Sequence, residues 1–181
     1  MAGFYSDRVV AVAGSSRLPP GGAELVARVA RALEASGCSL VVGGCAGADQ
    51  AALSAASAVR VLCAFGPGGA GAGPASAVRA VLAAQASGVP VAWWAGGSPS
   101  VPLKARLARR TAAVVAEASA GCVVFPFSPV VTGSGSWLAA SPWRAAAGGC
   151  LPGVVSRLRA ATAREYGQWG PTGSGVWSGA W

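Results

Sequence analysis

The chain has 181 residues, enough for one α/β domain with a full hydrophobic core. Its hydrophobic fraction of 53% is inflated by alanine, and only 11% of the residues are charged. No apolar run free of Gly, Pro or charge reaches the roughly 18 to 20 residues of a membrane span. Asp7 and Arg8 precede only a short apolar stretch, which is unlike a signal peptide. We therefore expect a cytoplasmic protein without membrane contact.

The net charge of +8 favours acidic partners such as nucleic acid, although the basic residues are spread along the chain. They cluster only at 104–110 and 157–164. There is no histidine, which excludes Ser–His and Cys–His nucleophile pairs. The five cysteines form no C-x-x-C pair, a pattern typical of reduced, mostly buried thiols and not of a zinc site or a disulfide framework.

Strand-like and helix-like segments alternate through the first 150 residues. We expect strands at 8–13, 39–42, 59–65, 89–95 and 121–127, and helices ending near 36, 56, 87, 118 and 147. The first helix has the clearest pattern, with Leu25, Val29 and Leu33 at helical spacing and Gly37 as its stop. Apolar strands alternating with helices predict an α/β fold, a Rossmann-like three-layer sandwich with a mostly parallel sheet.

The predicted organisation is a Rossmann-like nucleotide-binding domain over 1–150 and a C-terminal extension over 151–181. The extension contains Trp169, Trp177 and Trp181 among glycines. We expect it to pack on the domain, with its indoles covering a sheet edge or helix face, or to be partly ordered. A base-stacking or partner-binding arm is the alternative, because indole faces stack on nucleobases.

The most informative segment is a strand that ends in a glycine turn and continues as a helix, at 39–53. Three glycines follow Val42 within five positions, so the backbone can approach a ligand closely. A helix that starts at this turn directs its free N–H groups and its dipole toward an anion. Similar turns follow the strands at 8–13 and 121–127, and in a parallel sheet all three lie at one edge.

These turns supply most of the candidate ligand-binding residues. They are Gly14, Ser15, Ser16, Gly43, Gly44, Cys45, Gly47, Asp49, Gly133, Ser134, Gly135 and Ser136. Asp49 either serves the helix start or contacts a ligand hydroxyl. Cys45 is either a thiol with a lowered pKa or merely a small residue. Ser134 and Ser136 can cap the following helix, donate to a phosphate, or do both.

Arg110 completes the candidate site. At about 100° per residue, it falls on the apolar arc of the helix at 103–118, whereas Arg109 points away from that arc. An arginine on an apolar arc must extend to solvent or meet an anion. We expect the guanidinium to meet either a ligand phosphate or an internal carboxylate.

Several of these motifs resemble the SLOG superfamily, the Rossmann-type group that includes the DprA/Smf DNA-processing proteins and the Lonely Guy nucleotide hydrolases. The motifs that resemble this superfamily are G-S-S-R at 14–17, G-G-C-A-G-A-D at 43–49, T-G-S-G-S at 132–136 and A-R-L-A-R-R-T at 105–111. The resemblance covers roughly residues 8 to 150. It implies a nucleotide or nucleotide-derived ligand at the carboxyl edge of the sheet.

The chain also departs from the superfamily pattern. The arginine usual in the second turn is absent, and Arg17 is displaced by one residue. Ala139 lies where the resemblance calls for the catalytic glutamate of the phosphoribohydrolase branch. The inventory therefore favours binding over catalysis, with no catalytic residue and no metal ligand identified.

Three functions stay open. The first is a sensor or carrier that binds a nucleotide-like small molecule, the second is a DprA-like protein that binds single-stranded DNA, and the third is a nucleotide-processing hydrolase. A homodimer is a further expectation. No cofactor beyond a nucleotide-derived ligand is indicated.

Overall fold

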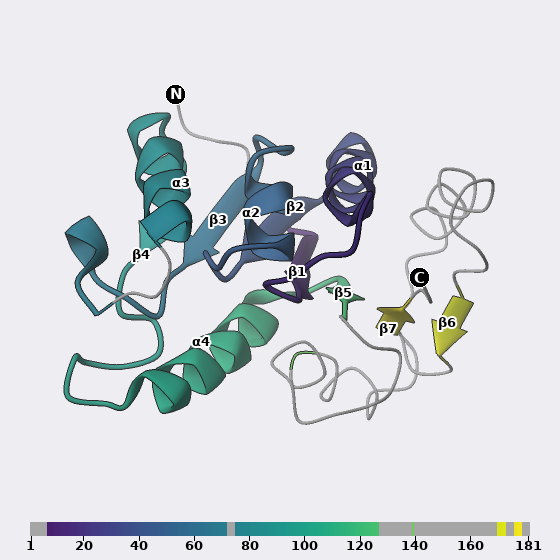
Figure 1. The fold of residues 1–181 in the computed structure, drawn as a ribbon. Helices are drawn as coiled ribbons and strands as arrows, with labels where there is room; N and C mark the ends of the chain where they lie inside the picture. Colours follow the sequence, from purple (N-terminus) through teal and green to yellow (C-terminus); the bar gives the residue numbers. More distant parts are fainter. Residues whose placement is uncertain (1–6, 72–74, 127–138, 140–169, 173–175, 179–181) are drawn as a thin grey trace.

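A parallel β-sheet forms the centre of the molecule in the computed structural model (Figure 1), which describes residues 7–71, 75–126, 139, 170–172 and 176–178. The strands are β1 (Val9–Gly14), β2 (Ser39–Val42), β3 (Val59–Leu62), β4 (Val91–Ala92), β5 (Gly121–Phe125), β6 (Gly170–Thr172) and β7 (Val176–Ser178). Their order in the sheet is β4-β3-β2-β1-β5-β7-β6. All neighbouring pairs are parallel except β6 and β7, so the predicted mostly parallel sheet is confirmed.

The direction of chain progression reverses at β1. Strands β1 to β4 are added toward one edge of the sheet, and β5 is then placed on the other side of β1. The register pairs Ala11 with Val41 of β2 and with Cys122 of β5. In open α/β sheets, ligands bind at the carboxyl ends of the strands beside such a reversal. Here that place is the end of β1.

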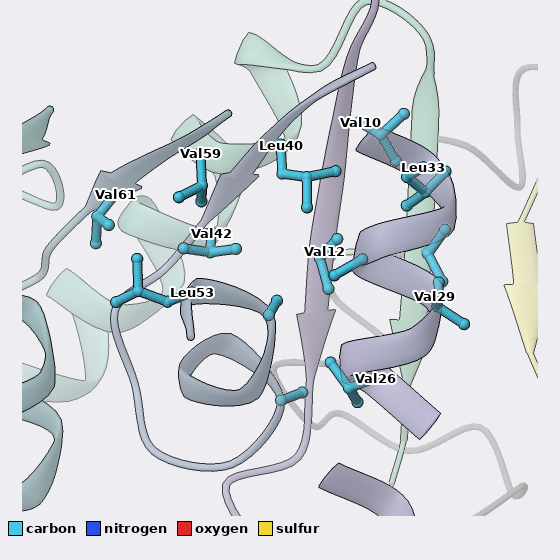
Figure 2. Packing of buried hydrophobic residues seen from close by; sticks show 14 of the residues in the cluster. Val10, Val12, Val26, Val29, Leu33, Leu40, Val42, Leu53, Val59 and Val61 are labelled. Carbon is cyan, nitrogen blue, oxygen red and sulfur yellow. The ribbon is translucent and has the colours of Figure 1, made fainter. Parts of the chain in front are cut away.

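Helices cover both faces of the sheet, which confirms the three-layer sandwich. Figure 1 shows α1 (Gly22–Ala35), α2 (Ala48–Leu53) and α3 (Ala75–Ala86) on one face and α4 (Leu103–Glu117) on the other. Alternate residues of each strand enter two separate cores, as the period of two requires. Val10 and Val12 pack toward α1 (Figure 2), whereas Ala11 and Ala13 pack in the cluster that contains Val114 of α4.

The first helix follows its sequence pattern closely. Leu25, Val29 and Leu33 are buried to 1% exposure or less, and Val29 and Leu33 lie against β1 in Figure 2. The helix ends at Ala35, and Gly37 takes a φ of +79°, a conformation that favours glycine. The apolar spacing and the glycine stop therefore account for this element.

Two strands are shorter in the structure than the sequence predicts. The expected strand at 59–65 is a strand over Val59–Leu62 and that at 89–95 over Val91–Ala92, although the Cys63 N–H still donates to the Ala92 carbonyl at 2.8 Å. The chain turns at Trp94, which has a φ of +57° and donates its N–H to the Phe65 carbonyl at 3.1 Å. Apolar content gave no sign of this turn, since Trp93 and Trp94 are as apolar as strand residues.

Some expectations fall outside the described residues: the turn at 132–136, all but Ala139 of the helix expected to end near 147, and the side chains of the C-terminal tryptophans. Within the described part, β7 pairs with β5 and β6 pairs with β7, so two short segments of the C-terminal extension add strands to the sheet. None of the described helices combines the length and the apolar character that crossing a membrane requires.

Candidate functional site

The turns after β1 and β2 lie together at the carboxyl edge of the sheet. The Ala48 N–H donates to the Ser15 carbonyl at 3.1 Å, and the Ser15 N–H donates to the Phe125 carbonyl at 2.8 Å. The ends of β1, β2 and β5 are thereby joined. This is the grouping of Gly14 and Gly43 that the parallel sheet predicts, while Gly133, Ser134, Gly135 and Ser136 lie outside the described residues.

The glycines of these turns make room for other parts of the protein. A Cβ at Gly43 would overlap the Arg110 guanidinium, and a Cβ at Gly47 would overlap the Ser15 carbonyl. Gly47 also has a φ of +78°. The open side of Gly44 faces the Cys63 thiol, and that of Gly14 faces the Ala48 methyl group. Close approach occurs at each position, as predicted, but the described neighbour is protein. Ligand contact at these glycines stays a prediction.

The buried Asp49 carboxylate stabilises the turn after β2. The residue is 4% exposed, and its Oδ2 accepts the Cys45 N–H at 3.0 Å. The same oxygen lies 3.1 Å from Nη1 of Arg110. Gly47 occupies the N-cap of α2, so Asp49 is not that helix's capping residue. Asp49 does lie in the first turn of α2, the expected place for a carboxylate at a helix start, and it also holds an arginine from α4. Contact with a ligand hydroxyl stays a prediction.

Arg110 points toward the sheet, as its helical phase predicts, and is 8% exposed. Its Nη1 donates to Asp49 at 3.1 Å, and its Nη2 lies 3.0 Å from the Cys45 Sγ. The internal carboxylate is therefore the partner that the structure shows. Its Nε is buried and has no hydrogen-bond partner among the described residues. The Nε–H of the guanidinium is thus left for a further group.

Burial and charge act against each other in this cluster. Burial raises the pKa of the Asp49 carboxyl, and the Arg110 guanidinium and the Cys45 N–H only partly oppose that rise. For Arg110, burial lowers the pKa, but the Asp49 charge, the hydrogen bond to Asp49 and the neighbouring thiols together outweigh burial and raise the pKa, so the arginine stays protonated. Burial also raises the pKa of the Cys45 thiol, against the Arg110 charge. Cys45 is consequently a neutral thiol at pH 7, not an activated nucleophile.

The sequence interpretation missed a second buried arginine, Arg106, which is 5% exposed. Its Nε donates to the Val101 carbonyl at 2.9 Å and its Nη1 to the Ala64 carbonyl at 2.8 Å. Its Nη2 donates to the Gly71 carbonyl at 3.3 Å, and the guanidinium lies 5.1 Å from the centre of the Trp94 ring. Arg106 precedes Arg110 by four residues, so the helical phase that singled out Arg110 could also have found it.

The first turn is more exposed. Ser15 Oγ accepts the Arg17 N–H at 2.9 Å, which fixes a local turn, while Ser16 and Arg17 lie at the surface.

Ala139 lies where the SLOG resemblance calls for a catalytic glutamate, and its side chain is fully buried in the core on the α4 side of the sheet. The described residues contain no group of three or more Cys, Asp or Glu that could hold a metal ion.

Two solved structures show the same architecture. Helicobacter pylori DNA processing protein A superposes with a TM-score of 0.61 at 19% identity, over 77% of this chain and 62% of that one. The Streptococcus pneumoniae protein superposes with a TM-score of 0.53 at 22% identity, over 84% of this chain and 55% of that one. This chain has the DprA-like fold.

The DprA-like fold confirms the architecture implied by the glycine-turn motifs. The chain spans less than two thirds of the length of either structure, and the identities are low, so the likeness concerns the fold. Neither a protein-family model nor a curated protein sequence matches the chain. The H. pylori protein is described as having a single-stranded DNA binding mode.

Proposed function

We propose that this protein binds single-stranded DNA at the carboxyl edge of its sheet. The observation that carries the proposal is an excess of positive charge at that edge, whereas the charges at the opposite edge largely balance. Three described carboxylates lie toward the opposite, amino edge, where helices end and strands begin: Asp7, Glu34 and Glu117. Arg8 and Arg60 lie at the same edge, and Arg60 pairs with Glu117 (Nη1 to Oε2, 3.4 Å), so the charges at the amino edge largely balance.

Basic residues gather at the other edge. Arg17 follows β1, and Lys104 and Arg109 lie in the first half of α4, which starts from the loop after β4. All three are exposed. The described carboxylates on this side are Glu24, in the first turn of α1, and Asp49, whose charge is balanced by Arg110. A surface of this kind attracts a polyanion.

The likeness to a single-strand-binding protein of H. pylori supports the choice of polymer. Binding should be measured by fluorescence anisotropy with an oligo-dT of about 20 nucleotides, a length above the site size of typical single-strand modules. We expect affinity to fall steeply between about 0.05 and 0.2 M salt, because bound phosphates release counterions. An affinity independent of salt, or no binding, would overturn the proposal.

A nucleotide-derived small molecule at the β2 turn is the second candidate, favoured by one observation. The buried Nε of Arg110 has no partner in the described part of the chain, and a buried donor of this kind is costly unless a further group accepts its hydrogen bond. A thermal-shift screen with AMP, ADP and cyclic nucleotides tests it. Stabilisation that Arg110→Lys abolishes, with little salt dependence, would favour this candidate over the polymer.

A further inference from the structure

Cys45 is the most accessible cysteine of the described chain. It is partly exposed in the turn after β2, whereas Cys38, Cys63 and Cys122 are buried at 2% exposure or less. Burial raises the pKa of the Cys63 and Cys122 thiols to about 12, so almost none of either thiol ionises near neutral pH. A reagent from solvent therefore reaches Cys45 before the other three described thiols.

The Cys45 sulfur lies at one edge of the Arg110 guanidinium. In this planar group the Nε–H and one Nη2–H point to the same side, where together they hold two acceptor atoms. The Cys45 Sγ lies 3.0 Å from Nη2, and sulfur is a weak acceptor. The neighbouring Nε is buried and has no hydrogen-bond partner among the described residues. A cation that is 8% exposed thus has an edge from which no described oxygen accepts a hydrogen bond.

Asp49 already supplies the countercharge of this arginine, because its Oδ2 lies 3.1 Å from Nη1. A second anion at the Nε/Nη2 edge would add net negative charge to a buried pair that is neutral, which is costly. A neutral oxygen adds no charge and is a stronger acceptor than sulfur. An oxygen atom bonded to the Cys45 sulfur would therefore complete the edge at the lowest cost.

We propose that Cys45 is a site of reversible oxidation by hydrogen peroxide, at which Arg110 stabilises the sulfenic acid. The thiol loses its proton to solvent, and the thiolate attacks one peroxide oxygen. The O–O bond breaks as the S–O bond forms, and the leaving hydroxide takes up a proton, so the products are Cys45–SOH and water. Sulfur is oxidised by two electrons and the peroxide is reduced. The new oxygen, one bond from Sγ, accepts the Nε–H of Arg110.

The selectivity of this site comes from access and from the stabilised product. Burial raises the pKa of the Cys45 thiol, and the Asp49 charge adds to that rise, against the Arg110 charge. The reactive thiolate is therefore scarce at pH 7, and the oxidation is slow. A small thiol reverses it in two steps: it forms a mixed disulfide with loss of water, and a second thiol then releases Cys45. The inference does not rest on the proposed function.

The first test locates the oxidised cysteine. Folded protein is treated with hydrogen peroxide at pH about 8, and sulfenic acid is trapped with dimedone and mapped by peptide mass. Cys150→Ser in every sample removes the cysteine that lies outside the described residues. We expect label at Cys45 at a dose that leaves the three buried cysteines unlabelled, and none when dithiothreitol precedes dimedone. No label at Cys45, or earlier label at a buried cysteine, overturns the site.

The second test concerns Arg110. Arg110→Lys keeps the positive charge beside Asp49 but removes the planar Nε/Nη2 edge. Oxidation of the protein that retains Arg110 should raise Tm by about 2–4 °C, the shift expected when one buried donor gains its partner in a domain of this length. Oxidation of Arg110→Lys should not raise Tm, and peroxide-treated Cys45→Ala, the matched control, should not change.

Two outcomes overturn the role of Arg110. One is a lower or unchanged Tm on oxidation of the protein that retains Arg110, and the other is an equal rise in Arg110→Lys. Should Arg110→Lys not fold, the comparison of the oxidised protein with peroxide-treated Cys45→Ala decides alone.

Discussion

Arg110 and Asp49 form a buried ion pair, with Nη1 and Oδ2 3.1 Å apart, that joins α4 to α2. The guanidinium fills the space that the missing side chain of Gly43 leaves open. Three positions far apart in the chain are thus mutually dependent: a glycine that admits the arginine, a carboxylate that neutralises it, and a helix that delivers it. Removal of one member should affect the other two.

We expect Arg110→Met to lower the free energy of unfolding by about 3–5 kcal/mol, because it leaves a buried carboxylate without its countercharge. The pKa of Asp49, already raised by burial, should rise further in this variant. The double variant Asp49→Leu/Arg110→Met should be more stable than Arg110→Met alone. Urea unfolding gives the free energy of unfolding of the unaltered protein, of Arg110→Met and of the double variant, with Arg109→Met as an exposed control. A loss no larger than that of the control would contradict the importance of the ion pair.

Gly43→Ala should be disruptive although its backbone is not in a left-handed conformation. The new methyl group would overlap the Arg110 guanidinium and lie 2.8 Å from the Asp49 Oδ2. We expect a loss of about 1–3 kcal/mol, typical of overpacking a buried site. In the Arg110→Met background the same substitution should cost less, since the clashing group is gone. Equal costs in both backgrounds, measured by urea unfolding, would refute this explanation.

Glu34 should make stability depend on pH. Burial raises the pKa of this carboxyl, but hydrogen bonds from the Ser57 hydroxyl and from the N–H groups of Ala58 and Ser57 outweigh burial, so the pKa lies below its ordinary value of 4.5. The ionised form is favoured in the folded state. Its contribution is therefore present above pH 4.5 and is lost as the pH falls through the folded pKa.

Glu34→Gln tests this linkage. At pH 7 we expect a loss of about 1 kcal/mol, the net contribution of such hydrogen bonds at a half-buried group. The difference from the unaltered protein should shrink as the pH falls toward about 3. Glu24→Gln, in the exposed first turn of α1, serves as the control. A difference that stays constant from pH 7 to acid would argue against the assignment.

We expect no phosphoribohydrolase activity. Ala139, fully buried, lies where the SLOG resemblance calls for a glutamate, and the chain has no histidine to take over proton transfer. Incubation of the protein with AMP, followed by chromatography of free adenine, is the measurement. Base release well above the rate without protein would show that another residue performs the chemistry.

The sequence by itself determined the layered α/β architecture. Leu25, Val29 and Leu33 at helical spacing specify the buried stripe of α1, and short apolar strands between helices specify a parallel sheet, because both signals arise from neighbours along the chain. The helical phase of α4 also predicts that Arg110 faces the sheet. These features depend on local periodicity, which a sequence displays directly.

Only the tertiary structure decided what the inward residues meet. Asp49 and Arg110 are 61 positions apart, and no local pattern indicates that they pair. The short β4, the turn at Trp94 and the three carbonyl partners of Arg106 depend in the same way on contacts between distant segments. Parallel strands bring every strand-to-helix loop to one edge, so Arg17, Lys104 and Arg109, which are far apart in the sequence, lie at the same edge of the sheet.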